Sequence, residues 1–179
     1  MFAVLGAHIL DADQVAREVV RPGTQCWLKL KVFLGSDYFD EDGQLRRCEL
    51  RRKIILDRDC RSAVNGLMHP HIAREMERQW KAFQITHPGR ITIFDIPLLF
   101  EADLAHRFDT IILVYAPREI QMQRLMLRDG VTQTEAAETL SMQLPIEVKR
   151  ARSHFTIDNS NDLDQTLQQV KEAWEKLIS

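Results

Sequence analysis

Two carboxylates, Asp11 and Asp13, stand where a short apolar segment turns into an amphipathic helical pattern. Ile9 and Leu10 end directly before them, and such strand-to-helix transitions are where open α/β sheets present their chemistry. Asp is among the best N-cap residues, and Asp11 with Gln14 fits the capping-box spacing, so one carboxylate has a structural task. Asp13 is then either a solvated acid of the first helical turn or part of a site.

Three further residues could join such a site. Asp95 ends the apolar segment of FDIPLLFE, where it could contact a substrate hydroxyl or a metal-bound water, or cap the following turn. Arg124 and Arg128 are four residues apart on one helix face, so they could reach a polyphosphate together or simply be solvated. A carboxylate together with arginines is suited to the transfer of a group onto a hydroxyl. This set of residue types is typical of kinases.

Metal chemistry is not indicated by the histidine-rich stretch LMHPHI. His69 and His71 form an H-x-H pattern, but the sequence places no third ligand beside them. We therefore interpret His69, ahead of a helical pattern, as a helix cap or an anion contact. The sequence predicts no resident metal site.

Composition and charge bound the class of protein. The 179 residues are 45% hydrophobic and 28% charged, which is enough for one domain with a full core. A net charge of −2 and a pI near 6.3 argue against a nucleic-acid binder. Any anionic ligand is expected to be small and to be bound by a local group of basic residues. With no membrane-length apolar stretch and no basic leader, we expect a cytoplasmic protein without membrane contact. Its three cysteines show no C-x-x-C spacing and are expected to be reduced: Cys26, Cys48 and Cys60.

Four apolar segments predict the strands of a parallel sheet, which are residues 8–11, 90–96, 109–116 and 154–158. The region between the first two is far longer than a simple crossover needs and is helical in pattern. We therefore expect a single domain over 1–179 with a helical subdomain at 14–89, divided by turn signals that include His69-Pro70.

A second helical excursion, residues 118–150, lies between the last two predicted strands. Thr132 and Glu135 have the spacing of a capping box, which predicts a helix start there. The segment carries a polar surface rich in arginine, and this makes it a candidate lid.

In six successive segments the chain resembles the dephospho-CoA kinases: ILDADQVAREVV, GQLRRCELRRKI, LMHPHI, FDIPLLFE, FDTIILVYAPREIQMQRLMLRDGVTQTEA and IDNS. The resemblance implies an α/β fold of the P-loop kinase kind, with a three-layer parallel sheet, an inserted helical substrate subdomain and a helical lid. It also implies transfer of the γ-phosphoryl group of ATP, with Mg²⁺, to the ribose 3′-hydroxyl of dephospho-CoA. ATP and dephospho-CoA are thus the expected partners.

The resemblance also suggests roles for individual residues. Asp13 would be the catalytic acid that orients or deprotonates the hydroxyl. Asp11, Arg17 and His69 would lie on the substrate side of the site. Asp95 would also lie there, at the end of its strand. The remaining three would contact the nucleotide, with two arginines on its phosphates and an amide near the adenine: Arg124, Arg128 and Asn159.

The chain departs from the family pattern at both ends. Near the last strand it has Ser153-His154 where the family usually shows Ala-Asp, and Ser160 where a glycine commonly follows the Asn. At the front, the family has G-x-x-x-x-G-K-[ST] before the DAD segment, but none of the seven glycines begins that pattern. The sheet would then lack its central first strand, so that 8–11 pairs with 90–96 and 109–116 with 154–158, without a ladder between the pairs.

Three functional hypotheses remain open at this point. The first is a dephospho-CoA kinase whose sequence lacks its N-terminal strand, phosphate loop and helix start. The second is a catalytically silent binding module for CoA-type ligands. The third, another small-molecule kinase such as a nucleoside-monophosphate kinase, is disfavoured by the long helical insertion that contains LMHPHI.

Overall fold

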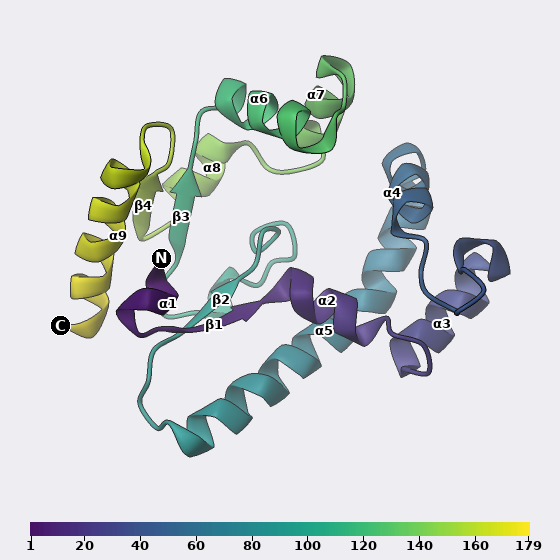
Figure 1. Ribbon diagram of the computed structural model, residues 1–179, viewed down its shortest axis with the longest axis horizontal. Coiled ribbons are helices and arrows are strands. Elements are labelled where there is room, and N and C mark those ends of the chain that lie inside the picture. Colours follow the sequence, from purple (N-terminus) through teal and green to yellow (C-terminus); the bar gives the residue numbers. More distant parts are fainter. The chain divides into compact units, whose positions relative to one another are not determined.

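The computed structural model describes residues 1–179, which form two compact units. One is continuous, Ala7–Ile96, and the other combines Met1–Gly6 with Pro97–Ser179. The four strands make two separate two-stranded parallel sheets, β1 with β2 and β3 with β4 (Figure 1). Both pairings and the α/β class are as predicted from the sequence. The predicted roles of 14–89 as a substrate subdomain and of 118–150 as a lid stay predictions.

The unit Ala7–Ile96 begins and ends with its two strands. Its elements are β1 (His8–Asp11), α2 (Ala12–Val19), α3 (Gln25–Leu34), a 3-10 helix (Ser36–Tyr38), α4 (Arg47–Leu56), α5 (Arg58–Thr86) and β2 (Thr92–Asp95). Figure 1 shows α5 as the long helix that runs past β1 and α2. The ladder starts with His8 opposite Thr92 and ends with Asp11 opposite Asp95, so both strands finish together.

Side chains at the helix starts explain where α2 and its neighbours begin. The carboxylate of Asp11 accepts hydrogen bonds from the main-chain N–H groups of Asp13 (2.8 Å) and Gln14 (3.0 Å), as predicted for an N-cap. The reciprocal bond of a capping box is absent, because the amide of Gln14 donates to Glu18 instead (3.4 Å). Thr24 and Asp57 cap α3 and α5 in the same way.

The expected break at His69-Pro70 is wrong, because α5 continues through both residues. A proline inside a helix lacks the N–H that would bond the carbonyl four residues earlier, and its ring crowds that carbonyl. Here that earlier residue is Gly66, and α5 continues past it to Thr86 without the missing bond. His69 accordingly lies in the middle of a 29-residue helix and does not cap one.

Two apolar clusters hold this unit together. Leu10, Val15 and Met76 are buried together and join β1, α2 and α5. The larger cluster joins the end of α2 to the helices α3, α4 and α5, and consists of Val20, Cys26, Leu30, Phe39, Leu50, Cys60 and Val64. The predicted apolar stripe of α2 therefore faces the core, which leaves its other face free to carry Asp13.

The second unit carries the other sheet. Its elements are α1 (Phe2–Leu5), a 3-10 helix (Ala105–Arg107), β3 (Ile112–Tyr115), α6 (Arg118–Asp129), α7 (Gln133–Ser141), α8 (Ile146–Ala151), β4 (Phe155–Asp158) and α9 (Leu163–Ile178). Helix α9 packs on β4 through Ile157, Val170 and Ala173. Thr132 and Glu135 form the predicted capping box at the start of α7. None of the helices combines the length and the apolar composition that crossing a membrane requires.

Candidate functional site

Three carboxylates gather at the carboxyl end of the β1–β2 sheet. Asp11 and Asp95 are the last register pair of the ladder, and Asp13 follows in the first turn of α2. The pKa of Asp95 is raised, first by desolvation from the surrounding protein atoms and then by the negative charges of Asp11 and Asp13. Asp95 therefore holds a proton more readily than an ordinary carboxyl group.

Asp13 and Asp95 are the carboxylates of this group whose oxygens remain available. Asp11 uses its side chain to cap α2, whereas the exposed side chain of Asp13 makes no hydrogen bond within the chain. Asp95 likewise accepts no hydrogen bond, so the alternative that it caps the following turn is not observed. A free carboxylate at a strand end can accept a hydrogen bond from an incoming hydroxyl and then its proton, which is the geometry that general-base catalysis needs.

Arg17 brings positive charge to the last turn of α2. The pKa of Arg47, the first residue of α4, is lowered by partial desolvation and then by the positive charge of Arg17. Neither forms an ion pair with a carboxylate of the chain, so the pair is suited to an anionic ligand. Arg47 was missed as a candidate residue, although it lies in the RRCELRR segment that carries part of the resemblance.

His69 lies in α5, exposed on its surface, yet desolvation lowers the pKa of its imidazole. It is therefore largely neutral near pH 7, so it can donate or accept a hydrogen bond but carries little charge for an anion. The predicted role of His69 on the substrate side remains a prediction, with hydrogen bonding as its available chemistry.

A cavity of about 420 Å³ opens beside the end of β1. One part of its wall is apolar, and Asp11 and Gln14 bring polar atoms from the start of α2. The α5 side contributes Arg78, Gln79 and Phe83.

In the other unit, two of the three predicted nucleotide residues are in contact. The guanidinium Nη2 of Arg124 donates to the main-chain oxygen of Asn159 at 2.7 Å. The main-chain N–H of Asn159 donates in turn to the carbonyl of Tyr115 (2.8 Å), so this contact lies where β3 and β4 end. Arg128 instead donates to both carboxylate oxygens of its neighbour Asp129, at 2.8 and 3.1 Å.

A buried ion pair in the same unit was not predicted. The Nζ of Lys149 lies 2.7 Å from Oε1 of Glu101, and the two side chains are only 7% and 18% exposed. Glu101 also accepts a hydrogen bond from the main-chain N–H of Leu144 (2.9 Å), while its other oxygen is buried without a partner. This pair ties the loop after Pro97 to the segment between α7 and α8, and Lys149 also lines a cavity of about 340 Å³.

The comparison with protein families shows the family to which the chain belongs. The family model described as dephospho-CoA kinase matches residues 1–165. The chain belongs to the dephospho-CoA kinase family. It is therefore a kinase-type transferase of coenzyme A biosynthesis, and the family resemblance seen in the sequence is confirmed.

Individual dephospho-CoA kinases match along nearly the whole chain. That of Dichelobacter nodosus is 34% identical over 178 residues, covering 99% of this chain and 88% of its own. That of Halalkalibacterium halodurans is 38% identical over 171 residues, covering 95% and 84%. The crystal structure of TT1252 from Thermus thermophilus, 25% identical, superposes with a TM-score of 0.79 over 98% of this chain and 87% of its own.

In this member of the dephospho-CoA kinase family, the side chains do not by themselves form a metal site. No group of three or more His, Cys, Asp or Glu residues lies close enough to hold a metal ion. That finding includes the three aspartates at the end of the β1–β2 sheet. No step of the chemistry is therefore assigned to a metal held by these residues.

Proposed function

We propose that this chain supplies the acceptor side of a reaction in which the γ-phosphoryl group of ATP passes to the ribose 3′-hydroxyl of dephospho-CoA. The observation that carries the proposal is the free carboxylate of Asp13 at the strand end, beside Asp11 and Asp95. As the 3′-oxygen bonds to the γ-phosphorus, the bond from that phosphorus to ADP breaks and the hydroxyl proton passes to Asp13. The products are coenzyme A and ADP.

The other residues have binding roles in this proposal. Asp11 and Asp95 border the acceptor hydroxyl, Arg17 meets an anionic group of dephospho-CoA, and His69 offers a neutral hydrogen-bonding imidazole. Arg124 and Arg128 contact the phosphates of the nucleotide, while Asn159 lies by its adenine. Support for grouping Arg124 with Asn159 comes from their 2.7 Å hydrogen bond.

ATP is expected to arrive as its Mg²⁺ complex, which is how phosphoryl donors of this kind are usually neutralised. The metal would be held mainly by the phosphates. We place the reaction in the cytoplasm, in keeping with three cysteines that form no disulfide.

A second candidate function is a binding module that takes CoA-type ligands without turnover. It is favoured by one observation, that the 179 residues contain no G-x-x-x-x-G-K-[ST] segment. That segment supplies main-chain N–H groups around the β-phosphate and a lysine for the β- and γ-phosphates, and phosphoryl transfer depends almost wholly on such positioning.

Mass spectrometry of the products separates the two functions. The chain and a version extended ahead of Met1 by the strand and phosphate loop of a relative are each incubated with dephospho-CoA and Mg-ATP. We expect coenzyme A from the extended version, and dephospho-CoA binding by calorimetry in both. Binding in both without product from either would support the silent module. Absence of dephospho-CoA binding would contradict both functions.

A further inference from the structure

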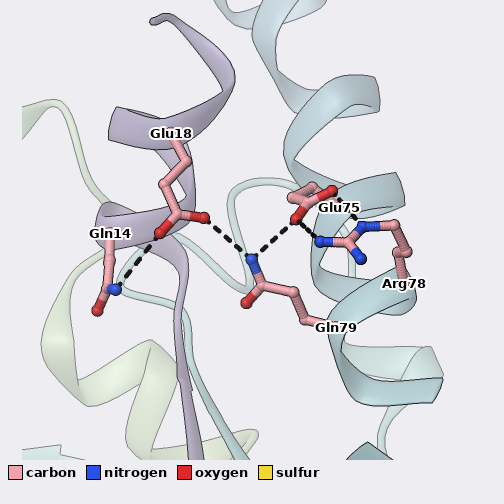
Figure 2. Close-up of polar contacts among 5 residues, drawn as sticks. All are labelled: Gln14, Glu18, Glu75, Arg78 and Gln79. Carbon is pink, nitrogen blue, oxygen red and sulfur yellow. Dashed lines mark hydrogen bonds and ion pairs between the residues drawn. The ribbon is translucent and has the colours of Figure 1, made fainter. Parts of the chain in front are cut away.

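A bridge of hydrogen bonds joins α2 to α5 through one glutamine. The side-chain amide of Gln79 donates one hydrogen to Oε2 of Glu18 (3.0 Å) and the other to Oε1 of Glu75 (2.9 Å), as Figure 2 shows. Glu18 also accepts from Gln14, which lies one turn earlier on α2 (3.4 Å). Gln79 and Glu18 are 61 residues apart in the sequence, so the bridge is a true tertiary contact.

The charges around the bridge make Gln79 hard to replace. Glu18 and Glu75 are both carboxylates, and a neutral amide with two N–H donors can satisfy both. Arg78 donates to both oxygens of Glu75 (2.8 and 2.6 Å). Hydrogen bonds from Arg78 and then Gln79 lower the pKa of Glu75 to about 2 against the effect of burial, so Glu75 accepts hydrogen bonds at any physiological pH.

The bridge supplies the directional contact that the apolar side of α2 lacks. Val15 packs against Leu10 and Met76, and Val19 and Val20 add apolar contacts at the end of α2, but apolar contact is not directional. Glu18 lies one turn beyond Val15 on nearly the same face, and hydrogen bonds demand a narrow range of geometry. The bridge therefore adds a directional restraint on how α2 is rotated on α5.

That rotation decides where Asp13 points. Five residues separate Asp13 from Glu18, which at 3.6 residues per turn puts them about 140° apart around the helix. Asp13 therefore lies away from α5, and its side chain makes no hydrogen bond that would hold it independently. From this we infer that Gln79 is a positioning residue for Asp13, acting through Glu18 and the orientation of α2. The inference rests on the proposed role of Asp13 as the residue that receives the hydroxyl proton.

The test uses the 179-residue chain without ATP and compares Gln79→Met with Gln84→Met. Methionine has nearly the length of glutamine but no N–H groups, and Gln84 lies on α5 but donates to Arg90 and Thr92 instead. Residual dipolar couplings of main-chain N–H groups report the orientation of α2 against α5. A carbon-detected pH titration of the Asp95 carboxyl reports the nearby charge of Asp13.

We expect Gln79→Met to change the couplings of α2 and to move the titration midpoint of Asp95 downward, while Gln84→Met changes neither. Gln79→Lys, which restores N–H donors, should return the couplings of α2 to those of the parent. A purely stabilising role would leave the folded orientation unchanged in all variants. Unchanged couplings and an unchanged Asp95 midpoint in Gln79→Met would overturn the inference.

If Gln79→Met does not fold, Glu18→Ala removes the other end of the bridge with a good helix former. Altered couplings in that variant support the inference and parent-like couplings overturn it. None of these readouts uses turnover, so a failure of the phosphotransfer proposal would appear in the coenzyme A assay and a failure of the positioning role would appear here.

Discussion

Asp11 and Asp95 stand opposite each other as the last pair of the β1–β2 ladder, so two carboxylates leave adjacent parallel strands at the same edge. The same aspartate that ends β1 caps α2 and thereby delivers Asp13 into the first turn of the helix. A D-x-D sequence after a strand thus produces one structural and one available carboxylate. The raised pKa of Asp95 is the electrostatic consequence of this crowding.

Asp13→Asn tests the chemical role of the available carboxylate, in the version extended by the phosphate loop. The amide keeps the shape of the side chain but cannot take the proton, so kcat should fall by about 10²- to 10⁴-fold with little change in KM. Asp164→Asn is a matched control, because Asp164 also follows an N-cap aspartate by two residues, at the start of α9. Turnover of Asp13→Asn within a few-fold of the parent would remove the role.

Binding of ATP to the 179-residue chain should be weak. No phosphate loop is present in these residues, and the arginines offered to the phosphates are already engaged, Arg124 with Asn159 and Arg128 with Asp129. Calorimetry with Mg-ATP should therefore show no submillimolar binding, whereas the extended version should bind. A tight Mg-ATP complex of the 179-residue chain would contradict this expectation.

Acidification should destabilise the unit Ala7–Ile96 through its histidines. Desolvation lowers the pKa of His8, His69 and His71, and nearby positive groups lower those of His8 and His71 further. In the unfolded chain these imidazoles titrate near about 6.5. Above that pH the three histidines make their full contribution to the free energy of unfolding. This contribution is lost as the pH falls through the lower pKa values of the folded state, because the unfolded state then binds more protons.

Urea unfolding at pH 7.5 and pH 5.5 measures this loss. His8→Phe should reduce it, since phenylalanine can keep the stacking on Phe83, where the ring centroids lie 3.7 Å apart, but does not titrate. A free energy of unfolding that rises on acidification, or a loss that is equal in His8→Phe and the parent, would show that His8 does not contribute.

Features of the fold that depend on neighbouring residues could be predicted from the sequence, whereas features that depend on contacts between remote residues could not. Strand positions and helix caps depend on a few neighbouring residues, so the four strands, the Asp11 cap and the Thr132 capping box could be predicted. Pro70 breaks the local rule because the long α5 gains its stability from packing along its length.

The contacts that join remote segments had no sequence signal. Gln79 meets Glu18 across 61 residues, and Glu101 meets the main chain of Leu144 across 43. Neither Gln79 nor Glu101 differs in type or spacing from a solvated surface residue. These long-range contacts were therefore missed, whereas the acids and most of the arginines proposed for the site were identified as candidates from their local patterns.

Removing one partner of the Lys149–Glu101 ion pair should cost far more stability than removing one partner of a surface pair of the same length. Its N–O distance of 2.7 Å equals that of Lys81 with Glu77, but the side chains are 7% and 18% exposed in the first pair and 64% and 42% in the second. Lys149→Met leaves the largely buried Glu101 carboxylate without its counter-charge, which should lower the free energy of unfolding by about 3–5 kcal/mol. Lys81→Met should cost about 0–1 kcal/mol, because water solvates the carboxylate that remains.

The double variant Lys149→Met with Glu101→Leu distinguishes the effect of an unpaired buried charge from that of simple loss of packing. Removing both charges also removes the desolvation cost of each, so the double variant should recover most of the stability lost in Lys149→Met. One cost does remain, since the N–H of Leu144 loses the carboxylate that accepts its hydrogen bond. Urea unfolding of the parent, Lys149→Met, Glu101→Leu and the double variant measures this coupling, with Lys81→Met as the surface comparison. Equal losses for Lys149→Met and Lys81→Met, or a double variant that loses the sum of both single changes, would show that the buried pair does not stabilise the loop after Pro97.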